Sequence, residues 1–145
     1  MSVYVEIVKG PLKPARIAIG EGTGAFVVFD GVVRPDEQGK RIRALEYQVY
    51  DPMAGQQLEL LANAMVKEFG LLDVSVWHSR GRVKVGQVSF RLVIEGAHRT
   101  EALEAMGEFI DRMKRDVPIW KKPVFAEAKK NKSPSRKKTA KKGKR

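Results

Sequence analysis

Residues 88–115 read VSFRLVIEGAHRTEALEAMGEFIDRMKR, and the hydrophobic period changes part-way along this stretch. In its first part Val88, Phe90, Leu92 and Ile94 alternate mostly with polar side chains. Side chains two apart lie on the same face of a strand, so this period predicts a strand with one buried face. It is the clearest half-buried strand in the chain.

The second part of the stretch has a helical period. Leu103, Met106, Ile110 and Met113 follow one another at spacings of three, four and three, which is typical of an amphipathic helix. Acidic side chains lie near its start and basic ones near its end, so they complement the helix dipole. Pro118 is expected to end the helix, because the residue before a proline disfavours helical geometry.

Strand patterns also occupy much of the chain before this stretch. A short strand is predicted at 3–8. Residues 25–33 are almost continuously apolar, which is typical of a strand covered on both faces, so we expect them to form the central strand. Alternation predicts another strand over 43–50, and the polar loop 34–41 indicates a hairpin with a mobile basic tip.

A further helix is predicted over Met53–Phe69, where one face is apolar and Gly70 follows as a stop signal. A strand over 73–79 comes next, and a turn-rich connection through Gly81 and Gly86 leads to residue 88. This order of elements indicates an α+β fold, a mostly antiparallel sheet with two main helices packed on it, similar to an α/β hammerhead.

The composition limits the class of protein. A chain of 145 residues is expected to form one domain. No apolar run approaches the roughly 20 residues of a membrane helix, so we expect a cytoplasmic protein. With no cysteine and only two histidines, neither a metal nor a cofactor is expected, and any reactive sulfur must be brought in by another molecule.

The formal net charge of +11 is concentrated at the C-terminal end. Residues 129–145 hold ten Lys and Arg and no Asp or Glu, whereas residues 1–128 hold 18 basic and 17 acidic side chains. We therefore expect one near-neutral domain over 1–128 and a disordered basic tail over 129–145. The tail is interpreted as a solubility or polyanion-binding appendage, with docking to nucleic acid or an acidic partner as the alternative.

Basic residues at element ends are candidates for an anion site. Arg34 leaves a strand into a loop that Pro35 stiffens, although it could equally be a solvated loop arginine. His98 and Arg99 lie where backbone N–H groups at a helix start attract anions, and the alternative is a surface histidine that packs locally. His78 points to an apolar strand face and is interpreted as a core or interface histidine.

Lys114, Lys121 and Lys122 surround the stiff apolar turn 117–120. Amines near apolar side chains can act as nucleophiles or proton carriers, or they can hold a phosphate. The alternative is that Lys114 stabilises the helix C-terminus while Lys121 and Lys122 are solvated.

The predicted helix separates the two basic groups. At about 1.5 Å per residue, Arg99 and Lys114 lie roughly 20 Å apart, too far for one pocket. A symmetric dimer that places the helix start of one chain against the helix end of the other would join them.

Residues 24–34, 97–99 and 113–122 together resemble the catalytic (large) subunit of molybdopterin synthase. The stretches read GAFVVFDGVVR, AHR and MKRDVPIWKK. The combination of an Ala-His-Arg sequence with a following Lys-x-x-x-Pro-x-Trp-Lys run is specific when both occur in this order, and the likeness covers most of the expected domain.

The resemblance implies sulfur transfer in molybdenum cofactor biosynthesis. The family converts cyclic pyranopterin monophosphate to molybdopterin, and the sulfur arrives as a thiocarboxylate on the C-terminal Gly-Gly of a small ubiquitin-like subunit. Family members form a central homodimer within a heterotetramer. The absence of cysteine and the length of the helix both fit this scheme.

The resemblance also implies residue roles. Arg34, His98 and Arg99 would bind the phosphate and pterin, with His98 and Arg99 supplied by the second chain. Lys114 and Lys121 would be catalytic, and Lys121 and Lys122 would also contact the substrate. Two other functions remain open from the sequence: a nucleic-acid- or polyanion-binding module that acts through the tail, and a scaffold without turnover.

Overall fold

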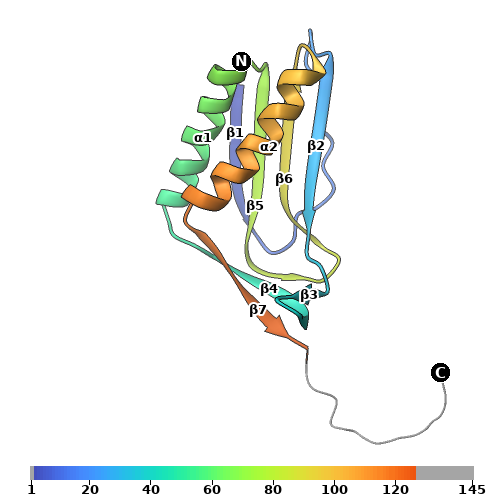
Figure 1. Cartoon of the computed structure of the whole chain (residues 1–145), viewed down its shortest axis with the longest axis vertical. Helices are drawn as coiled ribbons and strands as arrows, with labels where there is room; N and C mark the ends of the chain where they lie inside the picture. Colours follow the sequence, from blue (N-terminus) through green and yellow to red (C-terminus); the bar gives the residue numbers. More distant parts are fainter. Residues whose placement is uncertain (1, 127–145) are drawn as a thin grey trace, which may run out of the picture.

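The computed structural model describes residues 2–126, and the predicted tail lies outside them. Within this range two helices pack on one face of a twisted sheet (Figure 1). The elements in chain order are β1 (Ser2–Lys9), β2 (Ala25–Val32), β3 (Asp36–Glu37), β4 (Lys40–Val49), α1 (Met53–Phe69), β5 (Asp73–Lys84), β6 (Val88–Gly96), α2 (Arg99–Asp116) and β7 (Ile119–Phe125). Neither helix in this range is long and apolar enough to cross a membrane.

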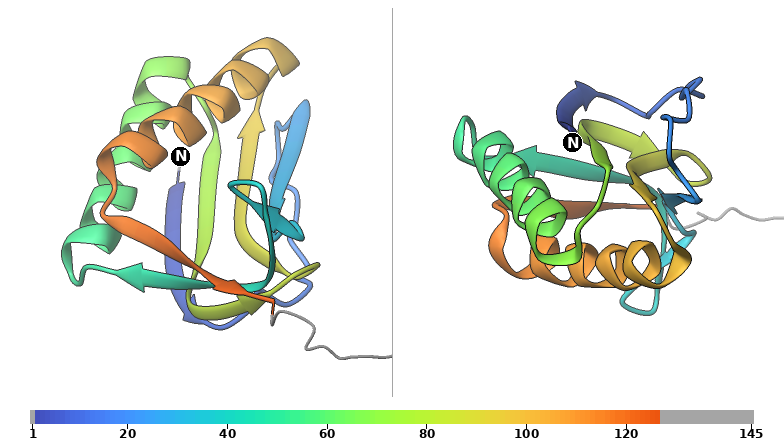
Figure 2. Two further views of the ribbon diagram at one scale, coloured as in Figure 1. Left: turned by 60° about the horizontal axis from the view of Figure 1, so that its bottom comes forward. Right: turned by 90° about the horizontal axis from the view of Figure 1, so that it is seen from above.

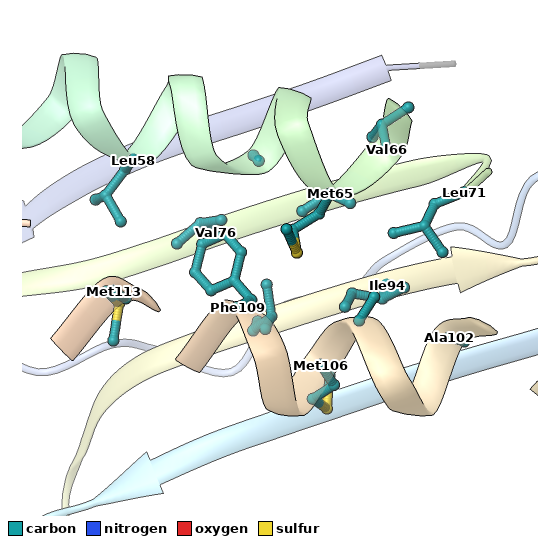
Figure 3. Close-up of a cluster of buried hydrophobic side chains, with 14 of the residues drawn as sticks. Leu58, Met65, Val66, Leu71, Val76, Ile94, Ala102, Met106, Phe109 and Met113 are labelled. Atoms are coloured by element: carbon teal, nitrogen blue, oxygen red, sulfur yellow. The ribbon is translucent and has the colours of Figure 1, made fainter. Parts of the chain in front are cut away.

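The main sheet has the strand order β1, β5, β6, β2. Only β1 and β5 pair in parallel among these strands, and the other pairs are antiparallel, which confirms the predicted α+β class. Helix α1 packs over β1 and β5, and α2 packs over β6 and β2. Figure 3 shows Phe109 of α2 and Met65 of α1 meeting Val76 and Ile94 of the sheet, where all four are fully buried.

Strands β3, β4 and β7 form a smaller group that crosses one end of the main sheet. Strand β5 pairs with β6 over Asp73–His78 and then continues, so that Gly81–Lys84 pairs with β4. Gly81 has a φ of +80°, a backbone conformation that side chains disfavour, and it lies at this change of partner. On its other edge β4 pairs with β7, and Figure 2 shows these two strands running across the lower end of the main sheet.

The helices begin and end where the sequence predicted. Helix α1 spans Met53–Phe69, and Gly70 follows in the left-handed conformation with its N–H bonded to the Val66 carbonyl. Helix α2 ends at Asp116, just before the Val117-Pro118 pair. His78 is buried, as its strand position indicated.

The prediction that 25–33 is the central strand is wrong. Strand β2 pairs with β6 alone among the described residues and forms an edge of the sheet. Val28, Phe29 and Val32 are exposed in the single chain. An apolar run reports side chains on both faces of a strand, but it carries no information on how many strands flank it.

The predicted hairpin between 25–33 and 43–50 is also wrong. Strand β4 leaves the main sheet to pair with β5 and β7, and the loop forms only the two-residue hairpin of β3 with the start of β4. Strand β7 was missed because prolines at 118 and 123 indicate a turn. Strand β5 extends beyond the predicted 73–79 and passes through Gly81.

Candidate active site

A cavity of about 770 Å³ opens where the main sheet meets the crossing strands, and residues at the C-terminal end of α2 line it. All strands from β2 to β7 contribute residues to its lining, and so does helix α2. The loops that follow β2 and α2 contribute further residues. Its apolar lining comes mainly from side chains of β2, β6 and α2. They include Phe29, Val32, Phe90, Ile110 and Met113. The volume falls in the range of small-molecule sites, and the apolar walls with a few polar groups are typical of them.

Three of the predicted site residues line this one cavity. Arg34 follows the end of β2, Lys114 lies in the last turn of α2, and Lys121 lies on β7. Arg34 and Lys114 are exposed on its rim. The missed strand β7 explains how Lys121 reaches the cavity, because pairing with β4 carries it beneath the helix end. The fold thus gathers three cations around one opening, as binding of an anion requires.

Lys121 meets a carboxylate inside the cavity. Its Nζ lies 3.3 Å from Oε2 of Glu37, on the β3 hairpin. The Glu37 side chain is 16% exposed and the Lys121 side chain 51%, so the carboxylate is the more enclosed partner. Glu37 therefore fixes the ammonium group at the cavity wall while leaving it open to a ligand.

The floor of the cavity is polar and uncharged. The Tyr47 hydroxyl and Ser89 Oγ are 2.8 Å apart. Nδ1 of the buried His78 lies 2.8 Å from the carbonyl oxygen of Ser79. Burial lowers the pKa of His78 and, together with the nearby charge of Glu37, raises the pKa of Tyr47, while the bond to Ser89 opposes that rise. Both groups are neutral near pH 7.

His98 and Arg99 do not line the cavity. They start α2, where the Glu101 carboxylate accepts a hydrogen bond from the His98 backbone N–H at 2.9 Å. Bonds from the N–H groups of Glu101 itself and of His98 lower the pKa of this carboxyl. The His98 side chain is 83% exposed. From Arg99 to Lys114 the helix rises about 22 Å, so this chain keeps the two basic groups apart, as predicted.

Lys122 is separated from the cavity by the strand that carries it. Successive side chains of β7 point to opposite faces, and Ile119 and Lys121 line the cavity while Lys122 does not. Lys122 lies opposite Glu46 of β4 and is exposed. Its role as a substrate ligand stays a prediction.

Sequence reasoning missed Glu37, Tyr47 and Ser89 as cavity residues. Glu37 belongs to a polar loop without a distinguishing motif, and the other two lie on ordinary alternating strands. His78 was interpreted correctly as buried, but no pattern in the sequence indicates that it also lines the cavity.

Comparison with known proteins shows the family. The model of the MoaE protein family matches residues 7–116, which include Arg34, His98, Arg99 and Lys114. The chain belongs to the MoaE family. The resemblance seen in the sequence is therefore confirmed, and the match does not support the nucleic-acid-binding alternative.

The curated relatives in the MoaE family carry the name molybdopterin synthase catalytic subunit. The protein of Pyrococcus abyssi is 36% identical over 105 residues, which cover 72% of this chain and 71% of the relative. The protein of Thermoplasma volcanium is 35% identical over 128 residues, covering 86% of this chain and 93% of the relative.

Solved MoaE-type structures share the fold. Molybdopterin synthase from Staphylococcus aureus superposes with a TM-score of 0.76 at 31% identity, covering 84% of this chain and 91% of the other. A chain in the protein–protein complex of subunits 1 and 2 of molybdopterin-converting factor from Helicobacter pylori gives a TM-score of 0.65 at 27% identity, covering 86% and 91%.

Proposed function

We propose that this chain is the catalytic subunit of molybdopterin synthase. It transfers sulfur from the C-terminal thiocarboxylate of a small ubiquitin-like subunit to cyclic pyranopterin monophosphate, and the product carries the molybdopterin dithiolene. The observation that carries the proposal is the convergence of Arg34, Lys114 and Lys121 on one cavity in a chain of the MoaE family. The reaction belongs to the cytoplasm.

The lysines suit the charge changes of this reaction. Once the thiocarboxylate sulfur has bonded to the pterin, water attacks the carbonyl carbon and forms a tetrahedral state whose oxygen carries negative charge; the acyl–sulfur bond then breaks, leaving the sulfur on the pterin and a carboxylate on the small subunit. Ammonium groups at Lys114 and Lys121 stabilise that oxygen and supply protons, and the amine left after such a transfer accepts a proton in turn. The apolar walls lower the effective dielectric constant near the reacting atoms, which strengthens the attraction between the ammonium groups and that oxygen. Arg34 on the rim binds the phosphate of the pterin.

The remaining predicted residues act from outside this cavity. His98 and Arg99 reach the pterin phosphate from a second copy of the chain, because helix α2 holds them far from the lysines of their own chain. The assembly is a homodimer flanked by two small subunits, and Lys122 contacts a part of the substrate that extends outside the cavity.

The test is a reconstituted reaction of the chain with a thiocarboxylated small subunit and cyclic pyranopterin monophosphate, with dithiolene formation as the readout. Replacing Lys114 and Lys121 by Ala together should abolish product, because both charges that stabilise the oxyanion are lost. The Lys67→Ala variant changes an exposed lysine on α1, away from the cavity, and should keep full turnover.

Circular dichroism and melting curves show whether each variant is folded. A folded double variant with near-normal turnover would contradict the assignment of the lysines. A wild-type chain that forms no product with a proven small subunit would contradict the proposed function as a whole.

A further inference from the structure

His78 is a titratable side chain at the cavity that the proposed mechanism does not use. It is 6% exposed and lines the cavity floor. Its Nδ1 lies 2.8 Å from the Ser79 carbonyl oxygen, which can only accept a hydrogen bond. Nδ1 therefore carries the ring proton. In the neutral imidazole Nε2 is then a hydrogen-bond acceptor.

This acceptor has no protein partner among residues 2–126 within hydrogen-bond distance. Nδ1 is occupied by the backbone and the ring lines the cavity, so Nε2 is the ring nitrogen left to meet a ligand there. The Tyr47 and Ser89 hydroxyls of the cavity bond to each other, and neither makes a hydrogen bond to Nε2. Buried polar atoms without a partner are rare in folded proteins and call for a ligand or water.

Two aromatic rings hold the imidazole in place. The ring of Tyr47 meets His78 edge-on, with centroids 5.2 Å apart at 82°. The ring of Phe90 packs at 5.7 Å and 48°. With Nδ1 fixed by the backbone, the direction of the Nε2 lone pair is set before any ligand enters. Such preorganisation favours binding, because little side-chain freedom is lost when the ligand arrives.

We propose that His78 Nε2 accepts a hydrogen bond from an N–H group of a ligand bound at the cavity floor. The inference rests on the proposed function, which brings two such donors to this cavity. One is the ring N–H edge of the pterin, and the other is a peptide N–H of the Gly-Gly tail of the small subunit. The cationic rim binds the anionic groups of the pterin and of the tail, so the neutral floor contacts a different part of whichever ligand is bound.

The chemistry of the floor supports an N–H donor rather than an anion. Burial keeps His78 neutral, and the other polar groups named on the floor, the Tyr47 and Ser89 hydroxyls, are uncharged and bond to each other. An uncharged acceptor in an apolar surround attracts an N–H group and repels a carboxylate or phosphate oxygen. His78 therefore acts as a specificity residue, in a different part of the cavity from the lysines.

Two substitutions of His78 distinguish the contribution of Nδ1 from that of Nε2. In His78→Asn the amide NH₂ can take the place of Nδ1–H against the Ser79 carbonyl, but no atom reaches the position of Nε2. In His78→Gln the longer side chain can place its amide oxygen near that position. We expect the Asn variant to lose about tenfold in affinity for the ligand that donates, and the Gln variant to recover most of it.

The measurements identify the donor. If it is the pterin, the KM for cyclic pyranopterin monophosphate rises in the Asn variant with kcat little changed, while the small subunit binds as in the wild type. If it is the tail, calorimetry shows weaker binding of the small subunit, and the loss disappears for a small subunit that lacks its terminal Gly-Gly. Unchanged values of both constants in a folded Asn variant would overturn the proposal.

A measurement without substitution covers the case in which the variants do not fold. In ¹⁵N-labelled wild-type protein, the His78 Nε2 resonance should report an unprotonated nitrogen and should shift when the pterin or the small subunit is added. A resonance that stays unchanged at saturation with both would refute the proposal. Direct binding also separates this outcome from failure of the proposed function, because it requires no turnover.

Discussion

Glu37 is the carboxylate that holds the predicted catalytic lysine, and its contribution can be isolated by one substitution. Glu37→Gln keeps the shape of the side chain but removes the charge that faces Lys121 Nζ at 3.3 Å. We expect turnover to fall about two- to fivefold, the range for a partly exposed ion pair, because Lys121 then samples positions outside the cavity. The measurement is kcat with saturating small subunit and pterin.

Asp36 provides the matched control, because it lies next to Glu37 on β3, is exposed and does not line the cavity. Asp36→Asn makes the same change of charge and should leave kcat unaltered. In a Lys121→Ala background, Glu37→Gln should have no further effect. Equal losses from the two β3 substitutions would argue for a general charge effect and against the contact with Lys121.

The cations of the site could be found from the sequence, whereas their surroundings could not. Arg34, Lys114 and Lys121 stand out because they follow or flank stiff apolar segments. Tyr47, His78 and Ser89 become a floor only because β4, β5 and β6 meet at one corner of the fold. Their position side by side depends on strand pairing between distant segments, and hydrophobic periodicity carries no information on such pairing.

Among the elements, the helices were predictable to their ends and the sheet order was not. Helical periods, Gly70 and Pro118 are local signals, so α1 and α2 follow directly from them. The edge position of β2 and the pairing of β4 with β7 depend on which strand lies beside which, and this is settled by the packing of the whole chain.

Gly24 lies where the start of β2 approaches the turn before α2, and it leaves no room for a side chain. A Cβ there would lie 2.1 Å from the backbone oxygen of Ala97, which cannot move aside as a side chain can. Gly24→Ala should lower the free energy of unfolding by about 1–3 kcal/mol, the cost of overpacking. Urea denaturation measures the change.

Gly107 offers the opposite case within α2. It is exposed, and a Cβ built there meets nothing within 4 Å. Gly107→Ala should raise the free energy of unfolding by about 0.5–1 kcal/mol, because alanine favours the helix. Unchanged stability in Gly24→Ala would contradict the close approach of Gly24 to Ala97, and a loss of stability in Gly107→Ala would contradict the open space beside Gly107.

At the scale of the whole molecule, the fold divides the basic residues between two ends of α2. The cavity with Lys114 and Lys121 lies below one end, and His98 and Arg99 lie at the other. Since the helix is rigid over this length, a single chain holds half of the proposed site at each end. A complete site therefore requires two chains, and an isologous dimer would complete two sites at once.

Mixed dimers of two inactive variants test this division. One variant carries Lys114→Ala and Lys121→Ala, and the other carries His98→Ala and Arg99→Ala. In a dimer with one copy of each, one site takes its cavity from the second variant and its His98 and Arg99 from the first, so it is intact. Random pairing of equal amounts of the two variants should restore about a quarter of wild-type turnover, because half of the dimers are mixed and each has one intact site.

A mixture of Lys114→Ala with Lys121→Ala, which alter the same half, should gain nothing over the separate variants. If refolding the two double variants together gives no more activity than either alone, while cross-linking shows that mixed dimers form, then each chain must build its site by itself.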